Sequence, residues 1–200
     1  MRPILVLLVA RLYGVVSPAT LHAAVSLELL HNASLVHDDV VDESTERRGQ
    51  LSVNAIFNNK VAVLTGDYLL ATSLVHAELT NSHQIIRLVS SLGQDLADGE
   101  LLQLSNVSNH SFSETVYFDV IRKKTAALFA ACTEAAAYSV GVSEEEVKLA
   151  RLLGEYIGIC FQIKDDIFDY FDSKEIGKPT GNDMLCLLYT SPSPRDTERS

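Results

Sequence analysis

Two short acidic runs, each set in an apolar stretch with helical periodicity, limit most strongly what this chain can fold into. Both have the pattern D-D-x-x-D, at residues 38–42 and 165–169. On a helix, residues four positions apart share a face, so the first and last carboxylates of each run stack. Two like charges at ~6 Å repel by roughly 3 kcal/mol at an effective dielectric of ~20. A cation would offset this repulsion, and open carboxylate oxygens favour Mg²⁺ bound together with substrate phosphates.

A solvated helix face is the usual explanation for one acidic run alone. The flanks argue against it here, because valines surround the first run and Ile167 and Phe168 lie inside the second. Basic residues also follow closely, with Arg47 and Arg48 after the first run and Lys178 after the second. Acidic groups for a metal followed by basic groups for phosphate, twice in one chain, predict two metal–diphosphate clamps that face each other across a helical bundle.

The helical pattern extends over most of the chain and predicts an all-α fold. Few stretches alternate polar and apolar residues with a period of two, so no strands are expected. Residues 43–49 form a charged loop in this interpretation. The expected helices cover residues 3–13, 18–42, 51–58, 61–79, 82–107, 113–140 and 143–171.

Composition excludes several classes of function. A formal charge of -10 without a basic stripe argues against nucleic-acid binding. The three cysteines are odd in number and lack metal-ligand spacing, which favours a reducing compartment such as the cytoplasm. Arg11 interrupts the apolar run near the N-terminus, and no run reaches the ~20 apolar residues of a membrane-spanning helix.

Five motifs in order resemble those of the trans-prenyl (polyprenyl) diphosphate synthases. The resemblance covers residues 1–184, while residues 185–200, with two prolines among serines, are expected to be a disordered or non-native tail. One D-D-x-x-D run is moderately specific, whereas five motifs in family order are very specific. The motifs are HDDVVDESTERRG (37–49), GDYLLA (66–71), KTA (124–126), FQIKDDIFDY (161–170) and GKPTGND (177–183).

The resemblance implies an isoprenoid-synthase helical bundle, usually a homodimer, that uses Mg²⁺ and elongates an allylic diphosphate with isopentenyl diphosphate. It assigns Mg²⁺ ligation to Asp38, Asp42 and Asp165, with Asp39, Asp166 and Asp169 in support. The substrate contacts that it implies are Arg47, Lys124, Thr125, Gln162 and Lys178 for the allylic diphosphate and Arg2, His31 and Arg48 for isopentenyl diphosphate.

The residues one helical turn before the first acidic run bear on product length. Ala33 and Ser34 lie roughly 6–7 Å deeper along the same helix, where the growing chain is expected to pass. Small side chains leave a tunnel open, whereas the family's short-chain members often carry bulk there. The expected product is therefore long, with about six to ten isoprene units.

The chain also departs from the family pattern. Only Arg2 and Pro3 remain of the usual Gly-Lys-Arg-x-Arg-Pro run, and the family continues with several helices after GND. We therefore expect a partial bundle that lacks the first and last helices.

Three other functions stay open at this stage. Glu28 and His31 form one Glu-x-x-His unit, but a di-iron bundle needs two. A class I terpene cyclase on the same fold uses a different second metal motif, against which the second D-D-x-x-D run argues. A non-catalytic partner subunit of a two-chain prenyl synthase usually loses one acidic run, and both are intact here.

Overall fold

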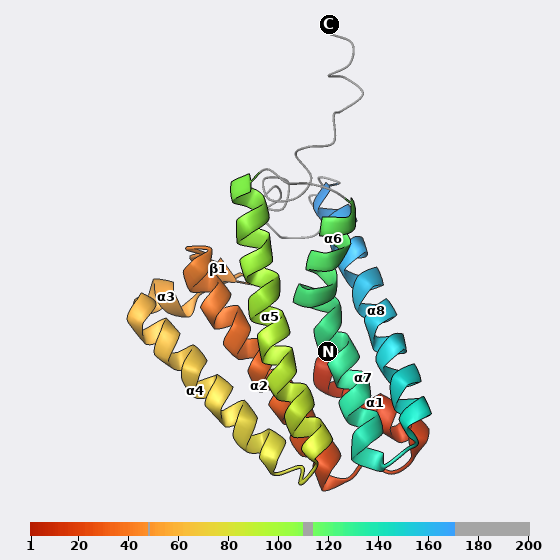
Figure 1. Ribbon diagram of the computed structural model, residues 1–200. Coiled ribbons are helices and arrows are strands. Elements are labelled where there is room, and N and C mark those ends of the chain that lie inside the picture. The colour runs from red at the N-terminus through yellow and green to blue at the C-terminus, as the bar shows by residue number, and fades with distance from the viewer. Residues whose placement is uncertain (48, 110–113, 171–200) are drawn as a thin grey trace, which may run out of the picture.

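The computed structural model describes residues 1–47, 49–109 and 114–170. Arg48, Lys178 and the predicted tail from residue 185 lie outside the described residues. The fold within them is an elongated bundle of helices (Figure 1), which confirms the predicted all-α class. Its helices are α1 (Arg2–Tyr13), α2 (Pro18–Val41), α3 (Val53–Ile56), α4 (Asn59–Glu78), α5 (His83–Asn109), α6 (Glu114–Ile121), α7 (Ala127–Val140) and α8 (Glu144–Tyr170).

Local signals in the sequence explain where α2 and α8 begin. The Ser17 hydroxyl accepts from the Thr20 N–H at 3.2 Å, while the Ser17 N–H donates to the Thr20 hydroxyl at 3.1 Å. The Ser143 N–H likewise donates to the Glu146 carboxylate at 3.1 Å. Such capping boxes satisfy backbone N–H groups that have no partner within the helix. Thr20 also bonds the Ser139 hydroxyl at 2.7 Å, which joins the start of α2 to the end of α7.

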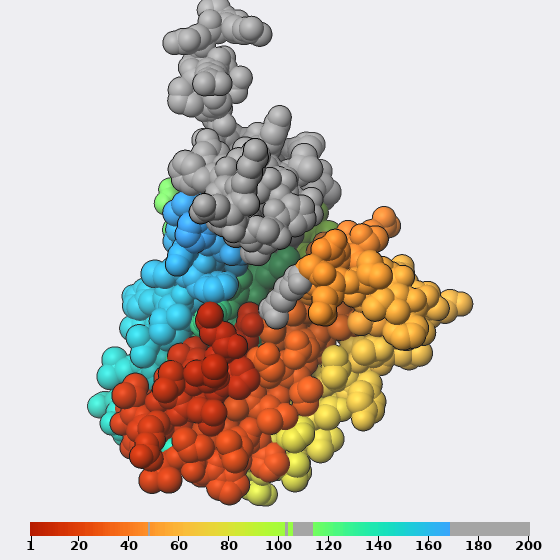
Figure 2. All heavy atoms as spheres, turned by 180° about the vertical axis from the view of Figure 1, so that it is seen from behind, coloured from red at the N-terminus to blue at the C-terminus, as the bar shows by residue number. Residues whose placement is uncertain are grey.

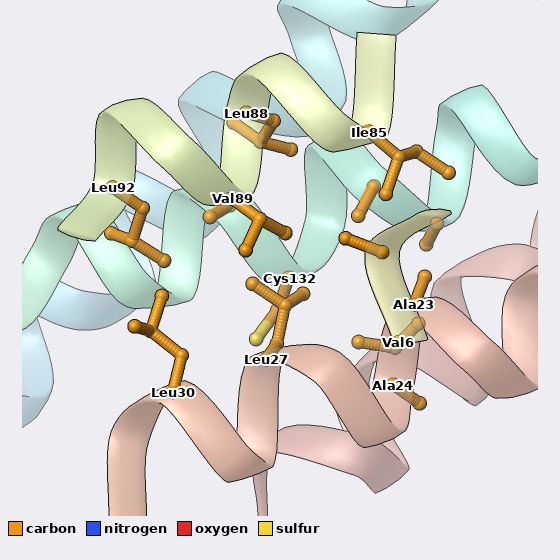
Figure 3. Close-up of a cluster of buried hydrophobic side chains, with 14 of the residues drawn as sticks. Val6, Ala23, Ala24, Leu27, Leu30, Ile85, Leu88, Val89, Leu92 and Cys132 are labelled. Carbon is orange, nitrogen blue, oxygen red and sulfur yellow. The ribbon is translucent and has the colours of Figure 1, made fainter. Parts of the chain in front are cut away.

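The core lies between α2, α5 and α7. In Figure 3, Leu27 and Leu30 of α2 point toward Val89 and Leu92 of α5, with Cys132 of α7 beside them. All five side chains are buried. The helix α1 contributes Val6 to the same cluster and lies on the outer face between α2 and α8 (Figure 2). This packing fixes α2, whose last turn carries the first acidic run, against α5.

Glycines allow α8 to approach α7 very closely. A Cβ atom on Gly154 would lie 2.5 Å from the Phe129 carbonyl oxygen, and one on Gly158 would lie 2.5 Å from the Ala126 Cα. No side chain fits at such distances, so the G-x-x-x-G spacing at residues 154–158 brings two backbones together. The contact fixes α8 a few turns before the second acidic run.

Two sequence expectations were wrong in detail. The stretch expected as a charged loop, residues 43–49, contains the short strand β1 (Glu46–Arg47). It pairs antiparallel with β2 (Gln50–Leu51), which includes the first residue of the helix expected over residues 51–58. Strands of two residues are too short to show a period of two in the sequence. The single helix expected over residues 113–140 is interrupted by a π-helical turn, η1 (Arg122–Ala126), between α6 and α7.

Three helices run toward the same end of the bundle. The C-terminal ends of α2, α5 and the described part of α8 lie together at the end from which α6 starts (Figure 1). Both acidic runs are in the last turns of such helices, on α2 and α8. The connectivity therefore brings two runs more than 120 residues apart to one end of the molecule. None of the helices in the described ranges is long and apolar enough to cross a membrane.

Candidate functional site

The first acidic run ends α2. The Asp42 N–H donates to the Asp38 carbonyl at 2.8 Å, which continues the helical turn and keeps both residues on one face. Burial raises the pKa of Asp38 to about 6; the charge of Lys124 opposes this rise, while Glu100 and Asp42 add to it. Burial likewise raises the pKa of Asp42. The positive charges of Lys124 and Arg47 thus only partly offset the effect of burial on the pKa values of these two carboxyl groups.

Asp39 points away from this face and organises the following loop. Its side chain is 5% exposed, and its Oδ1 accepts from Arg47 Nε at 2.7 Å and from Arg47 Nη2 at 2.6 Å. The Asn54 amide adds hydrogen bonds to the Asp39 and Ser44 carbonyls, at 3.1 and 3.0 Å. Arg47, expected from sequence as a diphosphate contact, is therefore held by Asp39 with about a third of its side chain exposed.

The GDYLLA motif packs against the first run. A Cβ atom on Gly66 would clash with the His37 imidazole as it is placed, so the glycine lets the ring pack against α4. The Nε2 atom of His37 lies 3.3 Å from Oδ1 of Asp67. Gly66 and Asp67 thus fix the residue that directly precedes Asp38, and packing accounts for this motif.

The π-helical turn η1 brings Lys124 toward α5. Lys124 Nζ lies 2.8 Å from Glu100 Oε2, and Lys123 Nζ lies 3.8 Å from Asp98 Oδ2. Between the two acids, a Cβ atom on Gly99 would lie 3.2 Å from the backbone nitrogen of Lys124. A π-helical turn adds a residue to the helix and often marks a functional position. Here it presents two consecutive residues, Lys124 and Thr125, to different helices.

Thr125 connects η1 to the second acidic run. Its hydroxyl donates to Gln162 Oε1 at 2.7 Å, and Gln162 Nε2 donates to Asp166 Oδ1 at 2.7 Å. The other oxygen of Asp166 accepts a hydrogen bond from the Tyr117 hydroxyl. Burial, together with Asp166, raises the pKa of Tyr117. Asp165 is half-buried on the same turn, and the side chain of Asp169 lies outside the described part of α8.

Residues of η1 act on both acidic runs. Lys124 acts electrostatically on Asp38 and Asp42, while its neighbour Thr125 joins Gln162 and Asp166. The candidate site therefore lies at the end of the bundle where α2, α5 and α8 end, with η1 between the acidic runs (Figure 1). Within the described residues, no three His, Cys, Asp or Glu side chains are gathered closely enough to hold a metal by themselves.

Arg2 and His31 are the described residues expected to contact isopentenyl diphosphate. The Arg2 guanidinium lies 5.6 Å from the centroid of the Phe129 ring. His31 is 7% exposed on α2. Burial raises the pKa of Cys132 to about 12, with the charges of Arg2 and Glu28 acting on the thiol in opposite directions. Arg48, expected in this group, is outside the described residues.

The residues expected to control product length lie one turn before Asp38, as predicted. Ala33 is 2% exposed. Ser34 is half-buried, and its hydroxyl donates to the His31 carbonyl of the same helix at 2.9 Å. The hydroxyl is thus satisfied locally, and the side chain presents little bulk to its surroundings.

Glu100 and Tyr117 are the site residues that sequence reasoning did not assign. Neither Glu100 nor Tyr117 belongs to a motif quoted above. Both act through the three-dimensional course of η1, which no periodicity in the sequence indicates.

The chain is similar in sequence and fold to known prenyl synthases. A family model described as Polyprenyl synthetase matches residues 1–198. A crystal structure of geranylgeranyl pyrophosphate synthase from Bacteroides thetaiotaomicron is 82% identical, with a TM-score of 0.81, over 92% of this chain and 57% of that one. Heptaprenyl diphosphate synthase component 2 from Geobacillus stearothermophilus is 41% identical over 92% of this chain and 58% of its own.

A further solved structure carries ligands. It is a polyprenyl synthase from Caulobacter crescentus CB15 complexed with calcium and isoprenyl diphosphate, 35% identical, with a TM-score of 0.89. The match covers 98% of this chain and 63% of that one. This chain therefore spans less than two thirds of the length of each of these proteins.

Proposed function

Because this chain belongs to the polyprenyl synthetase family, we propose that the protein elongates an allylic diphosphate with isopentenyl diphosphate in a Mg²⁺-dependent reaction. The observation that carries the proposal is the position of η1, whose Lys124 faces the first carboxylate run and whose Thr125 bonds the network of the second. Residues 1–184 form the synthase part in this proposal, and its substrates are two diphosphates.

The residues at the site suit a divalent cation. Asp38 and Asp42 are partly buried carboxylates whose raised pKa values reflect lost solvation and incomplete compensation by Lys124 and Arg47. We assign ion binding to Asp38 and Asp42 on one side and Asp165 on the other. Mg²⁺ prefers one or two carboxylates together with substrate phosphates, which agrees with a site that no cluster of protein ligands completes. The relative complexed with calcium and isoprenyl diphosphate supports a divalent ion beside a diphosphate.

The chain's basic residues act on the leaving group. When the allylic C–O bond breaks, its electron pair leaves with diphosphate, and bound Mg²⁺ stabilises that charge. Lys124 supplies a point charge beside Asp38, while Arg47 offers a planar guanidinium already oriented by Asp39. The double bond of isopentenyl diphosphate attacks the allylic carbon, and a proton then passes to the released diphosphate. No protein base is needed in this scheme.

The second substrate is assigned to residues outside the two acidic runs. Arg2 and His31 come from different helices, α1 and α2, and Arg2 is already placed over the Phe129 ring. We propose that Arg2 and His31 contact isopentenyl diphosphate together with Arg48, and that Gln162 and Lys178 belong to the allylic side.

Two product lengths have support. The small side chains of Ala33 and Ser34, and the heptaprenyl relative, favour a product of about six to ten isoprene units. The 82% identical structure is titled geranylgeranyl pyrophosphate synthase, which favours four units. We propose the longer product, and product sizing decides between them.

The protein's partner is a second copy of itself in this proposal. Apolar side chains recur along one face of α4 at helical spacing, and Leu64 and Tyr68 are 67% and 72% exposed. Val61, Val75 and Leu79 continue the same stripe. A large exposed apolar face favours a protein interface. The heptaprenyl relative is named as component 2, which supports a different protein chain as the alternative partner.

The test is an elongation assay. A purified protein that contains residues 1–200 is incubated with farnesyl diphosphate, labelled isopentenyl diphosphate and Mg²⁺, and the products are sized. Asp38→Ala and Asp165→Ala should each reduce turnover by at least ~100-fold, because each removes a proposed ligand of the divalent ion that would hold the charged leaving group. Glu145→Ala, an exposed acid in the first turn of α8, is the matched control and should keep the normal rate.

The assay also separates the alternatives. A folded protein that elongates no primer but increases the turnover of a second chain would favour the non-catalytic partner subunit. Release of a cyclic hydrocarbon from one allylic diphosphate would favour the terpene cyclase. Normal turnover of either Asp→Ala variant would remove the metal role of that residue.

A further inference from the structure

Tyr117 reaches the second acidic run from a helix that carries none of the family motifs quoted above. It lies on α6, and its hydroxyl donates a hydrogen bond to Oδ2 of Asp166 on α8. Its ring packs edge-on against Phe118, with ring centroids 5.5 Å apart. The contact joins two residues that are 49 positions apart in the chain.

This hydrogen bond closes a ring of contacts around η1. From Tyr117 the ring passes to Asp166, then to Gln162, and then to Thr125, which lies in η1. The backbone from α6 into η1 returns to Tyr117. Both oxygens of Asp166 thus accept hydrogen bonds, one from Tyr117 and one from Gln162. Removing the Tyr117 hydroxyl would break this closed set of contacts at the hydrogen bond that α6 contributes.

The type of donor matters at this position. Carboxylates in the last turns of α8 meet the negative end of the helix dipole and repel one another. A lysine or arginine at residue 117 would neutralise Asp166 and compete with a metal for the run. A phenol orients the carboxylate and leaves its negative charge in place.

We propose that Tyr117 is a positioning residue, which holds the second acidic run through Asp166 in the orientation that receives a metal–diphosphate complex. This inference rests on the proposed function. Tyr117 itself touches neither substrate nor metal in this scheme. It acts on Asp165 indirectly, because Asp165 directly precedes Asp166 on the same helical turn.

The test uses Tyr117→Phe, which removes the hydroxyl and keeps the ring. We expect the Mg²⁺ concentration for half-maximal activity, and the KM for the allylic diphosphate, to rise on the order of tenfold, as expected for the loss of a hydrogen bond to a charged group. Tyr156→Phe is the matched control, since Tyr156 is a 59% exposed tyrosine of α8, and it should leave both values unchanged.

A double-mutant cycle separates positioning from a general structural effect. If Tyr117 acts through Asp166, then Tyr117→Phe should add little to the defect of Asp166→Asn. Additive defects would overturn the proposal, and so would a Mg²⁺ requirement of Tyr117→Phe equal to that of the unmodified protein.

Two measurements that do not need turnover distinguish a failure of this inference from a failure of the proposed function. Calorimetry with Mg²⁺ and inorganic pyrophosphate should show weaker binding in Tyr117→Phe, and amide hydrogen exchange should be faster at residues 162–168. If the unmodified protein elongates no primer, the proposed function fails while these two measurements still decide the role of Tyr117. Unchanged binding and exchange would overturn it. If Tyr117→Phe does not fold, slower exchange in Asp166→Asn than in the unmodified protein overturns it as well.

Discussion

At the scale of single residues, the partly buried carboxylate of Asp38 lowers stability but has a role in the proposed reaction. Its pKa is raised from 3.8 to about 6, chiefly by burial, so the folded protein holds this proton more tightly than the unfolded chain does. Below pH 3.8, Asp38 is protonated in both states and does not lower the free energy of unfolding. This free energy falls as the pH rises from 3.8 to about 6, and the loss stays constant above that. A group that is expensive to bury in its charged form is retained where the charge has a use.

Asp38→Asn should stabilise the metal-free protein at pH 7. We expect the free energy of unfolding to rise by about 1–2 kcal/mol, less than the full shift because the carboxylate keeps some contact with water. Urea denaturation at several pH values measures this. The gain should vanish below pH 3.8, where Asp38 is protonated in both states. A gain that is the same at all pH values would show that the effect is not electrostatic.

Ser34→Phe should shorten the product. The phenyl ring would project one turn before Asp38, where the present side chain is small and bonded to its own helix. Sizing the labelled products measures the change, with Ser34→Thr as a control that preserves the hydroxyl and adds little bulk. An unchanged length distribution in Ser34→Phe would place the growing chain elsewhere.

The sequence predicted the residue types of the site better than it predicted the partners of these residues. The i, i+4 spacing placed Asp38 and Asp42 on one face, as the structure has them. It could not assign Asp39 to Arg47, because that ion pair depends on the turn between β1 and β2. Tyr117 was missed for the same reason, since its contact with Asp166 depends on how α6 approaches α8.

At the scale of elements, the approach of α8 to α7 depends on glycine. Gly158→Ala would place a methyl group 2.5 Å from the Ala126 Cα, and backbone atoms cannot yield as a flexible side chain does. We expect a loss of about 2 kcal/mol in the free energy of unfolding, because overpacking exceeds the higher helix propensity of alanine. Chemical denaturation measures it.

Gly93→Ala is the matched control for this prediction. Gly93 is also inside a helix, α5, but a Cβ atom there meets only the Leu30 side chain at 3.9 Å. This variant should gain about 0.5–1 kcal/mol from reduced backbone entropy in the unfolded chain. Equal effects of the two substitutions would show that close packing at Gly158 is not the cause.

Helix boundaries were largely predictable, whereas the interruption within one helix was not. The helices expected from residues 3, 18 and 143 begin within one residue of those positions in the structure, as α1, α2 and α8. The π-helical turn η1 leaves the apolar pattern of residues 113–140 almost unaltered, so the expected single helix looked regular. Its cause is tertiary, in the contacts of Lys124 with Glu100 and of Thr125 with Gln162.

At the scale of the whole molecule, the exposed stripe of α4 should determine the oligomeric state. Leu64→Lys combined with Val75→Lys would place two charges on the apolar face. We expect this variant to be monomeric in light scattering after size exclusion, since charges buried without a partner oppose association. Leu149→Lys changes a leucine of α8 that is 63% exposed and should leave the oligomeric state unaltered. A dimer that survives the double substitution would place the interface elsewhere.

The common direction of α2, α5 and α8 has a consequence for how substrates arrive. Each helix carries a partial negative charge at its C-terminal end, and at α2 and α8 this adds to the acidic runs. A bare diphosphate that approaches this end meets repulsion, whereas one already complexed with a divalent ion is far less repelled. Under the proposed function, this field would favour arrival of the ion-complexed diphosphate during diffusion, before any side chain makes contact.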